Sequence, residues 1–115
     1  MNSFVLSALI TFNTCLPSDL QIEQWAIESN IPIEDTTLAN MKLGAMDACL
    51  EFQQEEIAKL SLRDQASFVV QTSLDHKISI RRVLLRSNAS DAVKEEVSAL
   101  LEERAADTAA EEPAK

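Results

Sequence analysis

Glycine is nearly absent from this chain, and this absence restricts the possible folds more than any other feature of the sequence. Gly44 is the only glycine among 115 residues, and the sequence contains three prolines and no tyrosine. An all-β sandwich needs many tight turns and many β-branched or aromatic runs, so this composition argues against one. Strong helix formers such as Ala, Leu, Glu, Gln and Lys are plentiful. We therefore expect an all-α fold.

A chain of this length forms a single domain. Hydrophobic periodicity and helix-capping residues predict a small helical bundle of about four to five helices over residues 1–106. A long central helix is expected over about 36–60, with N-caps offered by Asp35, Thr36 and Thr37. Residues 107–115 are low in hydrophobicity, and we expect them to form a disordered, flexible, acidic C-terminal tail.

Several local patterns locate the other helices. Ser18 and Ser61 each begin a capping-box arrangement, and Ser90 is an N-cap candidate for a helix carrying a clear apolar stripe. Trp25 is expected to anchor a short helix in the core. The apolar register of the helix after Ser61 fails near residues 74–77, which predicts a break there.

Residues 77–86 fit two structures. Ile78 and Ile80 alternate as in a strand, whereas Ile80, Val83 and Leu84 also suit one face of a helix. A helix is favoured, because no other segment offers an obvious strand partner.

Charge is distributed unevenly along the sequence. The first 17 residues carry no charged side chain, and residues 18–58 hold nine acids and one base. Residues 59–86 hold six bases and two acids, and residues 87–115 hold eight acids and three bases. The net charge of −9 lowers the expectation of nucleic-acid binding, because it repels phosphate backbones at long range.

The uncharged N-terminal segment has two interpretations. It either packs into the core of its own chain, or it forms an interface with a partner, since an exposed apolar chain end would promote aggregation. The candidate partner-binding residues of this segment are Phe4, Val5, Leu6, Leu9, Ile10 and Phe12.

The basic residues of the segment 77–86 form a second candidate surface, and they also have two interpretations. They either make ordinary ion pairs with the acidic helices of the same chain, or they dock an acidic partner or nucleic acid. These residues are Lys77, Arg81, Arg82 and Arg86.

No pattern in the sequence indicates catalysis, a cofactor or a metal site. His76 is the only histidine and is expected at the surface, and no ligand cluster with metal-site spacing accompanies it. Gly44 lies within a predicted helix, so a glycine-rich phosphate loop is absent from the sequence. We expect no catalytic residue, no cofactor and no small-molecule substrate.

The sequence also bears on location. Cys15 and Cys49 are isolated from each other and are expected to be reduced and packed. The apolar run over residues 4–12 has no preceding positive charge and is too short to span a membrane. We expect no membrane partner and no signal peptide, and a location in the cytoplasm or within an assembled particle.

These observations favour a non-enzymatic protein–protein interaction or assembly subunit, such as an adaptor, an assembly factor or a small virion-type structural protein. It would act through its apolar N-terminus and its segregated charges, on a protein partner or on further copies of itself. The alternative is a nucleic-acid-associated regulator, which either binds through residues 77–86 or acts as an acidic nucleic-acid mimic.

Overall fold

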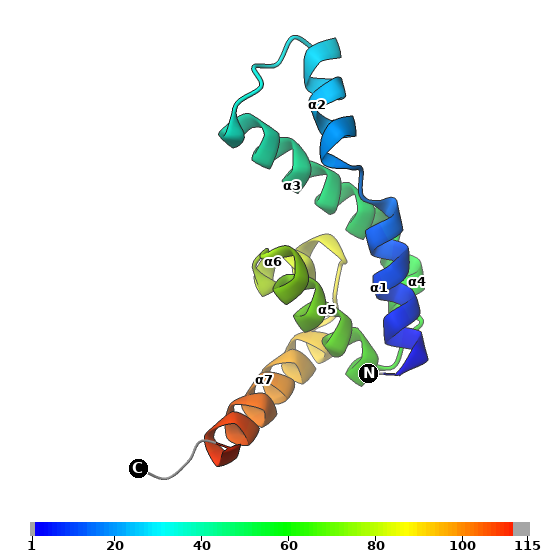
Figure 1. Cartoon of the computed structure of the whole chain (residues 1–115). Helices are drawn as coiled ribbons and strands as arrows, with labels where there is room; N and C mark the ends of the chain where they lie inside the picture. Colours follow the sequence, from blue (N-terminus) through cyan, green and yellow to red (C-terminus); the bar gives the residue numbers. More distant parts are fainter. Residues whose placement is uncertain (1, 112–115) are drawn as a thin grey trace.

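The all-α fold is confirmed. The computed structural model describes the backbone of residues 2–111 and the side chains of residues 2–107. Every regular element in this range is a helix: α1 (Ser3–Cys15), α2 (Asp19–Glu28), α3 (Asp35–Phe52), α4 (Gln54–Ala58), α5 (Leu62–His76), α6 (Ile80–Arg86) and α7 (Asp91–Glu111) (Figure 1). The described part thus has seven helical segments, or six if α4 is counted as a continuation of α3, against the four to five expected.

The helix starts follow the capping signals of the sequence. The Ser18 hydroxyl accepts the Gln21 N–H at 3.1 Å, and the Ser61 hydroxyl accepts the Asp64 N–H at 3.1 Å. The long helix starts one residue earlier than expected, and it ends at Phe52 rather than near residue 60, with α4 following as a separate segment. Glu34 is the N-cap of α3, and the Thr37 hydroxyl accepts the Glu34 N–H at 3.3 Å.

Three helices end at residues with left-handed backbone conformation. Asn30, Lys77 and Asn88 have φ angles of 56°, 54° and 55° and follow α2, α5 and α6, respectively. The break expected near residues 74–77 is therefore at Lys77. The helical alternative for residues 77–86 is correct, because Ile80–Arg86 forms α6.

Two helices organise the core. α5 packs against α1, α6 and α7, whereas α3 packs against α1, α2 and α6. The buried side chains come from nearly all helices and include Phe12, Met46, Leu50, Phe68, Val69, Val83, Val93 and Val97. Apolar residues at helical spacing place these side chains on inward faces, so the core forms without a sheet.

The molecule is elongated. Its radius of gyration is 16.5 Å, whereas a compact chain of this length has about 13 Å. Figure 1 shows that α2 and the first half of α3 stand away from the rest, and that α7 projects from the opposite end. Only Ile22 and Ala26 of α2 are buried. Trp25 is 42% exposed, so the prediction that it is a core anchor is wrong.

A disulfide joins Cys15 at the end of α1 to Cys49 of α3, with the two Cα atoms 6.0 Å apart. The expectation of two reduced cysteines is therefore wrong. The residues are 34 positions apart in the sequence, and only the packing of α1 on α3 brings them together. Closing a loop of this length contributes about 3–4 kcal/mol to stability in the chain-entropy model.

The C-terminal helix is longer than expected. α7 continues to Glu111, so residues 107–111 are helical where a flexible tail was expected. Alanines recur in this stretch of the sequence, and alanine has the highest intrinsic helix propensity. The remainder of the expected tail, residues 112–115, lies outside the described residues.

Candidate interaction surface

The N-terminal helix α1 has one buried face and one exposed face. Val5, Leu9 and Phe12 recur at helical spacing and are 1%, 7% and 0% exposed. The other three candidate residues point away from the core: Phe4 is 68% exposed, Leu6 50% and Ile10 55%. The core interpretation is therefore correct for Val5, Leu9 and Phe12, whereas the interface interpretation stays a prediction for Phe4, Leu6 and Ile10.

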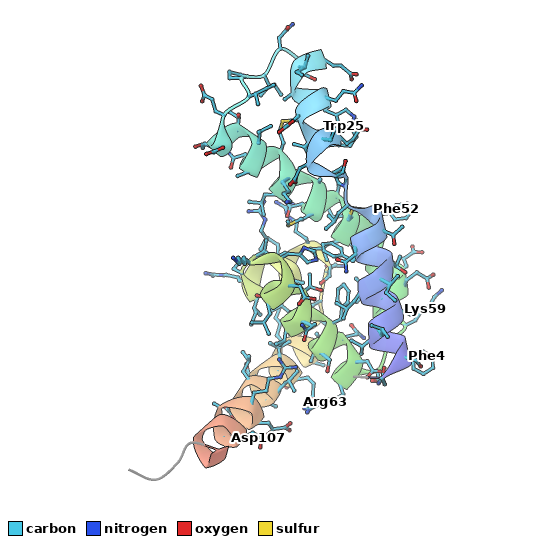
Figure 2. All side chains as sticks on the ribbon, in the orientation of Figure 1. Phe4, Trp25, Phe52, Lys59, Arg63 and Asp107 are labelled. Carbon is cyan, nitrogen blue, oxygen red and sulfur yellow. A yellow bond between two sulfur atoms is a disulfide. The ribbon has the colours of Figure 1, made fainter. Side chains whose placement is uncertain are left out.

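Phe52 extends the exposed apolar surface from α1 onto the end of α3. It is 86% exposed and lines a hollow of about 400 Å³ together with Ile10, Thr14 and Cys15. Figure 2 shows the Phe52 side chain beside the upper end of α1. Phe4 lines a neighbouring hollow that shares Thr11 and Gln53 with this one, whereas Leu6 lines neither hollow. We call Phe4, Ile10 and Phe52 the apolar patch.

Sequence reasoning missed Phe52, which lies at the end of an apolar stripe of α3 that also holds Leu38, Met41 and Ala45. α2 covers the first part of that stripe, but α2 has 10 residues and α3 has 18. Because α3 is longer than α2, the C-terminal end of the stripe extends beyond α2. This difference in helix length could have indicated that Phe52 is exposed.

The polar groups on the exposed face of α1 are mostly satisfied within the helix. The Thr11 hydroxyl donates to the Ser7 carbonyl at 2.9 Å, and the Thr14 hydroxyl donates to the Ile10 carbonyl at 2.8 Å. A group that already has its hydrogen bond costs less to bury than an unpaired one. A partner can therefore cover this face without leaving either hydroxyl donor unpaired.

A second, smaller hollow of about 210 Å³ lies between α1 and α4 and includes Phe4, Gln53 and Leu60 in its lining. Gln53 also lines the hollow at Phe52, and its side chain is almost fully buried. Within the described residues, its Oε1 atom has no hydrogen-bond partner. Gln53 thus connects the two hollows along the α1 surface.

The four cations of residues 77–86 fall into two groups: two form ion pairs within the chain, and two are exposed. Arg82 donates to both carboxylate oxygens of Asp47, at 2.8 Å and 2.5 Å. Arg86 donates to Glu51 at 3.1 Å, and its Nε lies 3.6 Å from Asp47. The hydrogen bond from Arg82 lowers the pKa of Asp47 below its ordinary value, against the opposing effect of burial.

The other two candidate cations, Lys77 and Arg81, are exposed, and neither forms a salt bridge within the described residues. The intramolecular interpretation of the basic segment therefore applies to Arg82 and Arg86. Lys77 and Arg81 remain accessible to a partner.

His76 is half-buried, although a surface position was expected. Its Nε2 lies 2.8 Å from Asn13 Oδ1, and its ring meets the edge of Phe12 with centroids 5.0 Å apart. Burial lowers the pKa of His76 below its ordinary value; the negative charge of Asp75 opposes this shift, and the positive charge of Lys42 adds to it. His76 therefore fixes α1 to the end of α5 as a neutral ring near pH 7.

Neither a free cysteine next to a histidine nor a cluster of metal ligands occurs in the described part of the chain. Both cysteines belong to the disulfide, so neither can act as a thiolate nucleophile paired with His76. Among the described residues, no group of three or more His, Cys, Asp or Glu side chains is arranged to hold a metal ion.

Over the same residues, no helix combines the length and the apolar character needed to cross a membrane. The chain matches no protein-family model, no curated protein and no solved structure.

Proposed function

We propose that this protein is a non-enzymatic assembly subunit that associates with further copies of itself through the apolar patch. The observation that carries this proposal is the exposure of Phe4 and Ile10 on α1, a helix with no charged residue, and of Phe52 beside it at the end of α3. A contiguous exposed apolar surface is typical of a protein–protein contact.

Self-association is favoured by the distribution of charge. A symmetric dimer brings the same patch of both subunits together, so like charges on that patch would repel. With a net charge of −9, most surfaces of this chain would repel their own copy. The exposed face of α1 carries no charge itself, and Glu56 is the charged residue that lines the hollow beside Phe4, so pairing this face with itself brings few like charges together.

An alternative assembly, in which the basic surface of one copy meets an acidic surface of the next, receives less support. Two of the four cations of residues 77–86 are already bound to Asp47 and Glu51 of the same chain. The same pairing weakens the alternative of nucleic-acid binding, because fewer cations remain to meet phosphates.

The disulfide bears on location. We expected the cytoplasm or an assembled particle, and disulfides persist mainly where the environment is oxidising. The Cys15–Cys49 bond therefore favours a particle exposed to oxidising surroundings over the reducing cytoplasm.

Sedimentation velocity of the full chain tests the proposed assembly. The wild type should form a dimer that persists at moderate salt, because the contact is apolar. Ile10→Gln should weaken dimerisation by at least about tenfold, since each copy loses a buried apolar side chain.

Leu20→Gln is the matched control, because Leu20 is 74% exposed but lies on α2, outside the apolar patch. This variant should dimerise like the wild type. A wild-type monomer at every concentration and salt, or an equal loss in both variants, would contradict the proposal.

A further inference from the structure

A hollow of about 280 Å³ lies between α3 and the connection from α5 to α6, away from the apolar patch. Its apolar lining comes from the core side of α3 and from Ile78. Its polar lining consists of His76 and two lysines. The lining residues are Ala39, Lys42, Leu43, Met46, His76, Lys77 and Ile78.

The charge of this hollow is opposite to that of the chain. Lys42 and Lys77 line it, and no carboxylate does. A neighbouring hollow beneath α2 shares Lys42 but is lined by Asp19, Glu23 and Asp35. The site at Lys77 is therefore locally cationic in an acidic protein, which favours an anionic ligand.

Lys42 is available to such a ligand. Its ammonium contacts Asp19 at 3.0 Å, but the two side chains are 46% and 83% exposed. Exposed ion pairs of this kind are weak, so a ligand carboxylate can share or replace Asp19 at little cost.

Lys77 is an unusual residue for its backbone conformation. The left-handed region is unfavourable for residues with a Cβ atom, and Gly or Asn is preferred at helix ends of this type. Asn30 and Asn88 follow that preference, whereas Lys77 departs from it with a φ of 54°. The fold thus places a lysine where an asparagine would be less strained, and that lysine lines the hollow.

His76 makes one wall rigid and uncharged. Its ring is held by Asn13 and stands against Phe12, and burial together with the charge of Lys42 lowers its pKa. Asp75, the carboxylate next to His76, accepts a hydrogen bond from Gln71 at 2.8 Å. The cationic character of the site therefore comes from the two lysines.

We propose that this hollow binds a small amphipathic carboxylate, with its alkyl part against Leu43, Met46 and Ile78 and its carboxylate at Lys42 and Lys77. An apolar interior with a few polar groups at the rim is the usual composition of a small-molecule site. A volume of about 280 Å³ lies just below the usual range of such sites, so the ligand is a short- or medium-chain acid.

Titration of the full-length protein with octanoate tests this site, observed by NMR at the Met46 methyl group and the Lys77 amide. Both signals should shift saturably. Affinity should rise from butyrate to hexanoate to octanoate, by up to about fourfold per added methylene while the apolar lining is being filled. Acetate and octanol are the controls, since acetate keeps the carboxylate without the long alkyl chain and octanol keeps the alkyl chain without the carboxylate.

Lys77→Asn separates ligand binding from folding, because asparagine tolerates the left-handed conformation. This variant should bind octanoate about two- to fivefold more weakly than the wild type, while melting at the same or a higher temperature. Arg81→Gln removes an exposed cation close in sequence that does not line the hollow, and it should bind octanoate normally.

The proposal fails if octanoate causes no saturable shift, if octanol binds as tightly as octanoate, or if Lys77→Asn and Arg81→Gln weaken binding equally. None of these results depends on dimerisation through α1, so this proposal and the assembly proposal fail separately.

Discussion

At the scale of single residues, the clearest long-range polar contact is the one between Asp47 and Arg82. Asp47 has a side chain only 14% exposed and holds both Arg82 and, at a longer distance, Arg86. Two hydrogen bonds from one guanidinium give this pair a fixed geometry, unlike most surface ion pairs. It connects α6 to α3, so it contributes to the packing of the fold.

Asp47→Asn should destabilise the protein at neutral pH by about 1–3 kcal/mol, because the Arg82 guanidinium loses its charged partner. The folded-state pKa of Asp47 is lowered from its ordinary value of 3.8. Its contribution is therefore present above that value and is lost as the pH falls through the lower folded-state pKa.

Urea unfolding of the wild type and Asp47→Asn across acidic and neutral pH measures this effect. The difference in unfolding free energy should shrink at low pH, where the wild-type carboxyl is protonated. Glu51→Gln is the control and should cost less, because Glu51 is half-exposed and holds Arg86 through a single bond. A difference in unfolding free energy between the wild type and Asp47→Asn that does not change with pH would contradict the role assigned to the Asp47 carboxylate.

At the scale of elements, α1 is held to the body by apolar packing and by the disulfide, in addition to the contact between Asn13 and His76. Its inner face packs apolar side chains against α5 and α3, and its last residue is bonded to Cys49. The arrangement explains how α1 can keep an exposed apolar face without detaching from the domain.

Reduction of the disulfide should lower the unfolding free energy by about 3–4 kcal/mol in the chain-entropy model. Guanidinium unfolding with and without a thiol reductant measures the loss. The double variant Cys15→Ala/Cys49→Ala is the control and should be insensitive to the reductant. Two titratable thiols in protein purified without reductant would show that the bond is not formed.

At the scale of the whole molecule, the fold consists of a packed body and a projecting arm. The body is formed around α5, and the arm comprises α2 and the first half of α3 (Figure 1). Few side chains of the arm are buried, and several of its apolar residues are exposed, namely Leu20, Trp25, Ile27 and Ile33. Stability should therefore differ between the two parts.

Hydrogen exchange followed by mass spectrometry should show faster exchange in α2 than in α5. α2 buries only Ile22 and Ala26, whereas α5 buries five side chains, including Phe68 and Val69. Local opening of the arm requires little apolar exposure, so it can occur without global unfolding. Equal protection of α2 and α5 in the dilute monomer would contradict this division.

Much of the fold could be predicted from the sequence because its signals are local. The near absence of glycine, the serine N-caps and the apolar spacing act over one or two helical turns. They correctly indicated the helical class, the start of α2 at Ser18 and the break at Lys77. Helix propensity also acts locally, yet the continuation of α7 through residues 107–111 was missed, because composition alone was taken to indicate disorder.

The sequence by itself determined that α1 is uncharged and that the basic residues gather in one segment. Only the tertiary structure decided which face of α1 is buried, that Cys15 meets Cys49, and that Arg82 finds Asp47. It also placed Lys42 and Lys77 in the lining of one hollow, although 35 positions separate them. Such pairings depend on how helices pack, and the packing is set by the sum of many weak contacts that no local pattern encodes.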